Sequence, residues 1–135
     1  MDLKDQLKQI LLTIIFTLTA YITIAQATLT IENNSKRSMT IKVMKGNNSS
    51  NDLYETIYIN AFQEKTITFY ESGYYFTKSK ATLNGKTPVY QKGQPFYVTN
   101  DETGYSVLTL TFSIKESNIP QVSGKQISKS EFDKN

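Results

Sequence analysis

The chain has 135 residues, with 15 lysines and arginines against 12 aspartates and glutamates, and neither cysteine nor histidine. Without cysteine there are no disulfides, thiolate catalysis, cysteine-ligated zinc sites or lipid-modified N-terminal cysteine, and without histidine the commonest general base and metal ligand is missing. A formal charge of +3 with no concentrated basic stripe argues against nucleic acid as a partner, and the length leaves room for one compact domain.

Residues 1–27 have the layout of a secretory signal peptide. Met1–Gln9 is polar and contains two lysines, Ile10–Ile24 is predominantly apolar, and the small residues Ala25 and Ala27 follow. At ~1.5 Å per residue the apolar run would extend roughly 22 Å as a helix, less than the ~30 Å hydrocarbon core of a bilayer. We therefore expect export to the periplasm or the extracellular space, with cleavage after Ala27 or, as the second choice, after Ala25. A retained N-terminal anchor is the alternative.

From residue 28 to residue 114 the chain alternates short apolar–polar runs with turn residues, which is typical of half-buried antiparallel strands. The run Tyr105–Ile114 is the clearest, with its apolar side chains on one face and mainly threonine and serine on the other. The expected strands, in chain order, are Thr28–Ile31, Met39–Val43, Leu53–Ile59, Lys65–Phe69, Tyr74–Leu83, a return strand up to Gln91, a short strand through Phe96 and Val98, and Tyr105–Ile114.

Asn84-Gly85 predicts a two-residue type I′ hairpin turn, because both central positions of that turn need positive φ. The resulting register would place Lys80 opposite Val89. Pro88 lacks the N–H that a ladder position requires, so we expect the pairing to end or bulge there, with Lys86–Gln91 as an edge segment.

These patterns predict an all-β protein, an antiparallel two-sheet β-sandwich of immunoglobulin-like size with 7–8 strands, preceded by the signal peptide. A small closed barrel is the alternative. The domain is expected to cover residues 28–114. Residues 115–135 are polar with isolated apolar residues, so we expect a flexible tail, with docking of Ile127 or Phe132 as the alternative.

The candidate recognition surface lies in Gly73–Val98, which is rich in lysine and aromatic residues and has no acidic residue. Alternation along the first strand of this stretch places four candidate partner-binding residues on one face, namely Tyr74, Phe76, Lys78 and Lys80. Tyrosine offers a flat amphipathic ring and lysine offers charge to an anionic partner. A solvated edge strand is the competing interpretation, because lysine is also common on exposed edges.

Motifs for catalysis or for a cofactor are missing, so we predict a non-enzymatic protein without cofactor or metal. Asn100–Glu102 and Asn51-Asp52 could offer oxygens to calcium, but turn chemistry explains both. The layout is similar, at the level of class only, to small exported β-sandwich proteins of bacteria. The leading hypothesis is binding of a protein or cell-surface partner through an unpaired edge strand. The alternatives are a membrane-surface or polysaccharide-binding module that uses exposed tyrosine and lysine, or a small inhibitor of a foreign enzyme.

Overall fold

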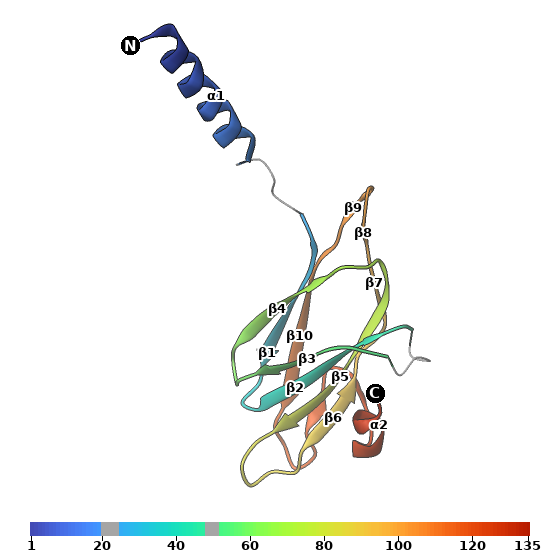
Figure 1. Ribbon diagram of the computed structural model, residues 1–135. Coiled ribbons are helices and arrows are strands. Elements are labelled where there is room, and N and C mark those ends of the chain that lie inside the picture. Colours follow the sequence, from blue (N-terminus) through green and yellow to red (C-terminus); the bar gives the residue numbers. More distant parts are fainter. Residues whose placement is uncertain (20–24, 48–51) are drawn as a thin grey trace.

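The computed structural model describes residues 1–19, 25–47 and 52–135 (Figure 1), so Asn51 of the second calcium candidate lies outside the described residues. A helix comes first, followed by strands and a short final helix. Their bounds are α1 Leu3–Thr19, β1 Ala27–Asn34, β2 Ser38–Lys45, β3 Asp52–Ile59, β4 Glu64–Phe69, β5 Gly73–Thr82, β6 Val89–Lys92, β7 Phe96–Val98, β8 Asn100–Asp101, β9 Gly104–Tyr105, β10 Val107–Lys115, β11 Gln121–Val122, β12 Lys125–Gln126 and α2 Lys129–Asp133.

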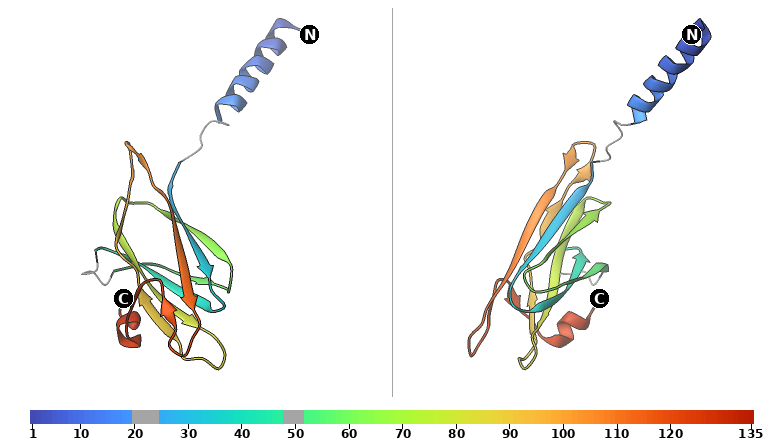
Figure 2. Two further views of the ribbon diagram at one scale, coloured as in Figure 1. Left: turned by 180° about the vertical axis from the view of Figure 1, so that it is seen from behind. Right: turned by 90° about the vertical axis from the view of Figure 1, so that its left-hand side faces the viewer.

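The strands form a two-layer β-sandwich, seen nearly edge-on in the right-hand view of Figure 2. The smaller sheet has the order β11-β10-β1-β4, and the larger sheet has the order β12-β6-β5-β2-β3, with β7 also paired to β5. A third ribbon consists of β8 and β9. Within the described ranges no hydrogen-bonded ladder joins the two larger sheets, so the all-β sandwich describes this fold and a closed barrel does not.

The longer strands follow the alternation in the sequence. Along β1, Leu29 and Ile31 are fully buried, while Thr28 and Thr30, which alternate with them, are half-buried on the outer face. The centre of the core is a cluster of aromatic rings from both sheets. Phe69 of β4 lies 4.5 Å from Tyr75 of β5 and 5.4 Å from Tyr54 of β3 between ring centroids. Burial of such rings supplies much of the energy that holds the sheets together, at about 25 cal/mol per Å² of apolar surface.

One pairing departs from the antiparallel pattern that we expected, because β1 and β10 run parallel. The chain leaves the larger sheet through β7, passes the β8–β9 ribbon, and enters β10 at the end where β1 begins. There Thr28 donates from its N–H to the carbonyl of Ser106 at 2.9 Å. Both strands then run away from the same end, which makes the smaller sheet mixed.

The prediction of a type I′ turn at Asn84-Gly85 is wrong. Gly85 has a φ of 76°, but Asn84 is not among the described residues with positive φ. The ladder pairs Lys80 with Tyr90 and Ala81 with Val89, one residue away from the expected register. Since Pro88 cannot donate to a ladder, pairing starts immediately after it, and a shift of one residue moves side chains to the opposite face.

The C-terminal residues also differ from the flexible tail that we expected. Val122 of β11 pairs with Ile114, Gln126 of β12 pairs with Gln91, and Phe132 of α2 is buried. The edge predicted for Lys86–Gln91 is covered only at its end, because β12 pairs with Gln91 and Lys92. A short polar sequence can be ordered in this way because two neighbouring strands supply its backbone hydrogen bonds, and these partners are distant in the chain.

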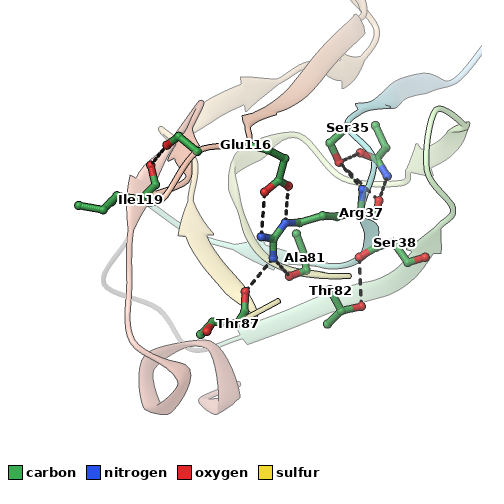
Figure 3. Close-up of polar contacts among 10 residues, drawn as sticks. Ser35, Arg37, Ser38, Ala81, Thr82, Thr87, Glu116 and Ile119 are labelled. Atoms are coloured by element: carbon green, nitrogen blue, oxygen red, sulfur yellow. Dashed lines mark hydrogen bonds and ion pairs between the residues drawn. The ribbon is translucent and has the colours of Figure 1, made fainter. Parts of the chain in front are cut away.

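Arg37, in the turn between β1 and β2, is fully buried and forms an ion pair with Glu116 just after β10 (Figure 3). The guanidinium contacts both carboxylate oxygens, with Nε–Oε1 at 2.7 Å and Nη2–Oε2 at 3.2 Å. It also donates to the carbonyl of Thr87 at 2.8 Å, in the loop between β5 and β6. The single side chain therefore connects segments that belong to both sheets.

Replacement of Glu116 by glutamine should destabilise the fold, because the buried Arg37 guanidinium would lose its counter-charge. Glu116→Gln should lower the free energy of unfolding by about 3 kcal/mol at neutral pH, measured by urea denaturation. The same change at Glu102, an exposed residue in the β8–β9 turn, is the matched control and should cost less than about 0.5 kcal/mol.

The difference in the free energy of unfolding between the wild type and Glu116→Gln should depend on pH in a defined direction. Hydrogen bonding to Arg37, with a further contribution from its charge, lowers the pKa of Glu116 from the ordinary value of 4.5. The stabilisation is therefore complete above pH 4.5 and is lost as the pH falls through the depressed pKa of the folded state. The two denaturation curves should converge in acid, and a gap that persists there would contradict this account.

Candidate functional site

The four residues predicted as a recognition surface lie along β5 and point to the outer face of the larger sheet, but they differ in exposure. Tyr74 is 51% exposed and its ring meets that of Tyr97 edge-to-face at 5.0 Å. Phe76 and Lys78 are buried, and Lys80 is half-buried. The aromatic Tyr74 is therefore the exposed member of the set, and Lys78 is covered.

Cross-strand pairing brings further lysines beside Lys78. Lys42 of β2 and Lys92 of β6 are its direct register partners on either side, and we call these three residues the lysine row. Lys125 of β12 is in turn the register partner of Lys92. Directly opposed side chains lie about 5 Å apart at Cβ, so the row concentrates like charges on one line across the sheet.

The C-terminal segment, residues 128–135, covers this row. Lys78 Nζ donates to the carbonyls of Glu131 and Lys134 at 3.0 and 2.8 Å. Lys42 Nζ donates to the carbonyl of Phe132 at 3.0 Å and lies 4.8 Å from the centre of its ring. In both views of Figure 2, α2 lies beside the larger sheet, where it contacts β5 and β6.

The environment disfavours the charged form of Lys78. Desolvation is the largest cause that lowers the pKa of its ammonium group, the positive charges of Lys42 and Lys92 lower it further, and Glu131 partly counteracts them. Lys92 Nζ lies 3.5 Å from Glu131 Oε1 and 5.0 Å from the ring centre of Phe76. The row is therefore a site where positive charge is concentrated and partly desolvated.

A second feature is the edge of the larger sheet at β3. This strand pairs with β2, and in the sheets formed by residues 25–47 and 52–135 no strand pairs with its other side. Tyr58 projects from β3 with 66% of its surface exposed. Phe62, in the turn that follows, is 62% exposed and has a φ of 58°, a conformation that is strained for a bulky side chain.

A third feature is the end of the sandwich where β1 begins. Ala27 pairs with Phe69, whose carbonyl accepts a hydrogen bond from Asn100 Nδ2 at 3.1 Å. Figure 1 shows the β8–β9 ribbon at this end. Four tyrosines from the adjoining strands and turns are more than half exposed there, namely Tyr70, Tyr74, Tyr97 and Tyr105.

A cavity of about 380 Å³ opens between the sheets and is lined by apolar side chains including Phe96, Leu110 and Phe112. Among the described residues, the charged side chains in its lining are Lys92 and Lys125 and none is a carboxylate, so it offers no acid–base pair. In the part of the chain that the structure describes, no group of three acidic residues lies close enough to hold a metal. Asp101 of the calcium candidate instead accepts hydrogen bonds from the N–H and hydroxyl of Thr103, which is ordinary turn chemistry.

No protein-family model, curated protein or solved structure matches the chain. Nor does any described helix combine the length and apolar character needed to cross a bilayer.

Sequence reasoning placed Lys78 on a candidate surface but did not find Lys42, Lys92 or Phe132 as its neighbours. Their proximity depends on strand order and register, which no local pattern encodes. The acidic–aromatic sequence Glu131-Phe132-Asp133 is the one signal that could have indicated a partner for a basic surface.

Proposed function

We propose that the protein is an exported, non-enzymatic sandwich of immunoglobulin-like size that binds an extended segment of a partner protein by strand addition at β3. The observation that carries this proposal is the open side of β3 together with the exposed rings of Tyr58 and Phe62. An open edge offers unpaired backbone donors and acceptors to an incoming strand.

The sequence of β3 supports strand addition at its second half. Proteins usually protect an edge with lysine, proline or an inward-pointing charge. Glu55, whose register partner Val43 is buried, is such a charge in the first half of β3. Thr56–Ile59 contains no charge and no proline, and β-branched and aromatic residues make up this stretch. An apolar side chain of the partner strand would pack on Tyr58. A residue further along the same partner segment would reach Phe62.

Peptides selected from a random display library against the full chain should bind through β3. Tyr58→Lys places a charge on the edge and should weaken a selected peptide at least tenfold, measured by fluorescence anisotropy. Tyr105→Lys, an equally charged change at another exposed tyrosine, is the control and should leave affinity unchanged. Bound peptide should slow amide hydrogen exchange in residues 54–59. Selection of peptides that protect other residues, or that bind both lysine variants equally, contradicts strand addition at β3.

Phe62→Asn provides an independent check, because asparagine tolerates positive φ. Relief of the strain should raise the free energy of unfolding by about 1 kcal/mol, while the loss of the exposed ring weakens peptide binding. An unstrained variant that binds as well as the wild type would remove Phe62 from the binding surface.

Export through a cleaved signal peptide is part of the proposal, and the position of Ala27 bears on the cleavage site. Ala27 is fully buried as the first residue of β1, whereas Ala25 is exposed. A cut after Ala25 keeps Ala27 in the sheet, while a cut after Ala27 removes a buried residue from the strand. We therefore prefer cleavage after Ala25, which reverses the order of preference drawn from the small-residue pattern.

The exported protein should begin at Gln26, as determined by N-terminal sequencing and intact mass. Ala25→Asp should leave the precursor uncleaved, because the peptidase requires a small residue before the cut. A mature chain that begins at Thr28 contradicts this assignment.

A second candidate function is contact with a membrane surface, and the exposed tyrosines at the β1 end favour it. Tyrosine is enriched at membrane interfaces, where its ring is buried and its hydroxyl stays hydrated. If the N-terminal segment were retained as an anchor, this end of the sandwich would be the one attached to it.

Co-sedimentation with vesicles of phosphatidylglycerol and phosphatidylcholine tests this candidate. The full chain should bind, and Tyr70→Ser combined with Tyr105→Ser should reduce the bound fraction several-fold. Tyr58→Ser is the matched control, because this exposed tyrosine lies on β3. Absence of vesicle binding by the full chain, or equal binding by both variants, excludes the tyrosine end as a membrane contact.

A further inference from the structure

We infer that the lysine row is a docking site for a short peptide segment that presents backbone carbonyls, a carboxylate and an aromatic ring, and that the C-terminal segment occupies this site in cis. The inference goes beyond strand addition at β3 and does not depend on it. It concerns the outer face of the larger sheet.

The lysine row would be unfavourable on an uncovered sheet. Like charges directly opposite each other on neighbouring strands repel, and here Lys78 has a lysine on both sides. Simple solubility does not require three lysines in direct register, and Lys78 is only 2% exposed, so it is not a solvated surface residue. Such a row is compatible with folding when a ligand rich in oxygen acceptors lies across it.

The C-terminal segment supplies these acceptors. In addition to the three backbone carbonyls of residues 131, 132 and 134, Asn135 Oδ1 accepts from Lys42 Nζ at 2.7 Å. The carboxylate of Glu131 lies beside Lys92. The carbonyls belong to the C-terminal end of α2, where the helix carries partial negative charge. Each lysine of the row therefore meets an oxygen from the same eight-residue segment.

Phe132 is the apolar anchor of the segment. It is 6% exposed, its ring lies 5.5 Å from that of Tyr90, and the ammonium group of Lys42 lies over its face. Glu131 and Asp133 flank it in the sequence. Asp133 pairs with Lys129 of the same segment, so Glu131 is the carboxylate that faces the row. The ligand chemistry that this surface already accommodates is therefore a peptide with a central aromatic ring, an adjacent glutamate and free backbone carbonyls, rather than an anion alone.

The segment is held by few contacts, which makes exchange with another peptide feasible. Helix α2 has five residues, too short to be stable by itself, and Ser128 caps it through a hydrogen bond from the N–H of Glu131 at 3.1 Å. A cavity of about 290 Å³ remains between Phe76, Lys78 and the segment. Elements with few buried contacts open at low free-energy cost. A partner that presents a similar sequence would then replace the segment.

The test uses a fluorescein-labelled peptide with the sequence of residues 127–135, added to the full chain. Phe132→Ala releases the segment in cis and should bind the peptide at least tenfold more tightly than the wild type does. The reason is that the tethered segment competes at an effective concentration on the order of millimolar. Glu131→Lys is a second releasing variant that leaves Phe132 in place, and it should show the same gain.

Controls separate the lysine row from general charge effects. In the Phe132→Ala background, Lys78→Met should weaken peptide binding at least tenfold, whereas Lys65→Met, at an exposed lysine of β4 in the other sheet, should not. Circular dichroism and thermal unfolding establish that each variant is folded. A peptide with alanine in place of phenylalanine should bind at least tenfold more weakly.

The inference is overturned by equal affinity of the wild type and both releasing variants, or by binding that is insensitive to Lys78→Met. Equal binding of the phenylalanine and alanine peptides also overturns it, because the row would then be a plain anion site.

Discussion

The ion pair between the buried Arg37 and the half-buried Glu116 is the interaction on which the arrangement of the sandwich depends. A guanidinium without solvent contact must have a counter-charge and acceptors for its remaining donors. Glu116 and the carbonyl of Thr87 supply these from the end of β10 and from the β5–β6 loop. One end of the sandwich is therefore locked by a polar network that joins both sheets. The opposite end, where β1 begins, carries exposed tyrosines instead.

The lysine row also holds positive charge away from water, but different groups complement that charge. Arg37 is paired inside the fold by a carboxylate that cannot leave without loss of stability. Lys78 and its neighbours are complemented mainly by backbone carbonyls of a short terminal helix. Since that helix is held by one aromatic ring and a few polar contacts, this complement is exchangeable. The protein thus combines a permanent structural ion pair with a charged surface from which the C-terminal segment can be displaced. Separately, Phe62 is a strained, exposed ring near the open edge of β3.

Much of the secondary structure could be predicted from local pattern. The alternation of Leu108, Leu110, Phe112 and Ile114 with polar residues indicated β10, because side chains of a strand point alternately to the two faces. The β5–β6 register was missed because the Asn84-Gly85 signal competes with Pro88, and the proline determines where pairing begins. The order of residues 115–135 was missed because their partners are strands far away in the chain. Of the candidate surface, Tyr74 and Lys78 were placed on the same strand face, but the burial of Lys78 depends on the C-terminal segment.

By itself, the sequence determined the β class of the domain, the positions of its longer strands and the amphipathic character of β5. These follow from the local sequence, since residue type and spacing along the chain are sufficient to specify them. Only the tertiary structure decided which charges meet. It paired β1 with β10 in parallel, buried Arg37 against Glu116, aligned three lysines across neighbouring strands and brought Phe132 onto them. Those contacts depend on strand order and register, which are properties of the whole fold because every strand must satisfy its hydrogen bonds and bury its apolar face at once.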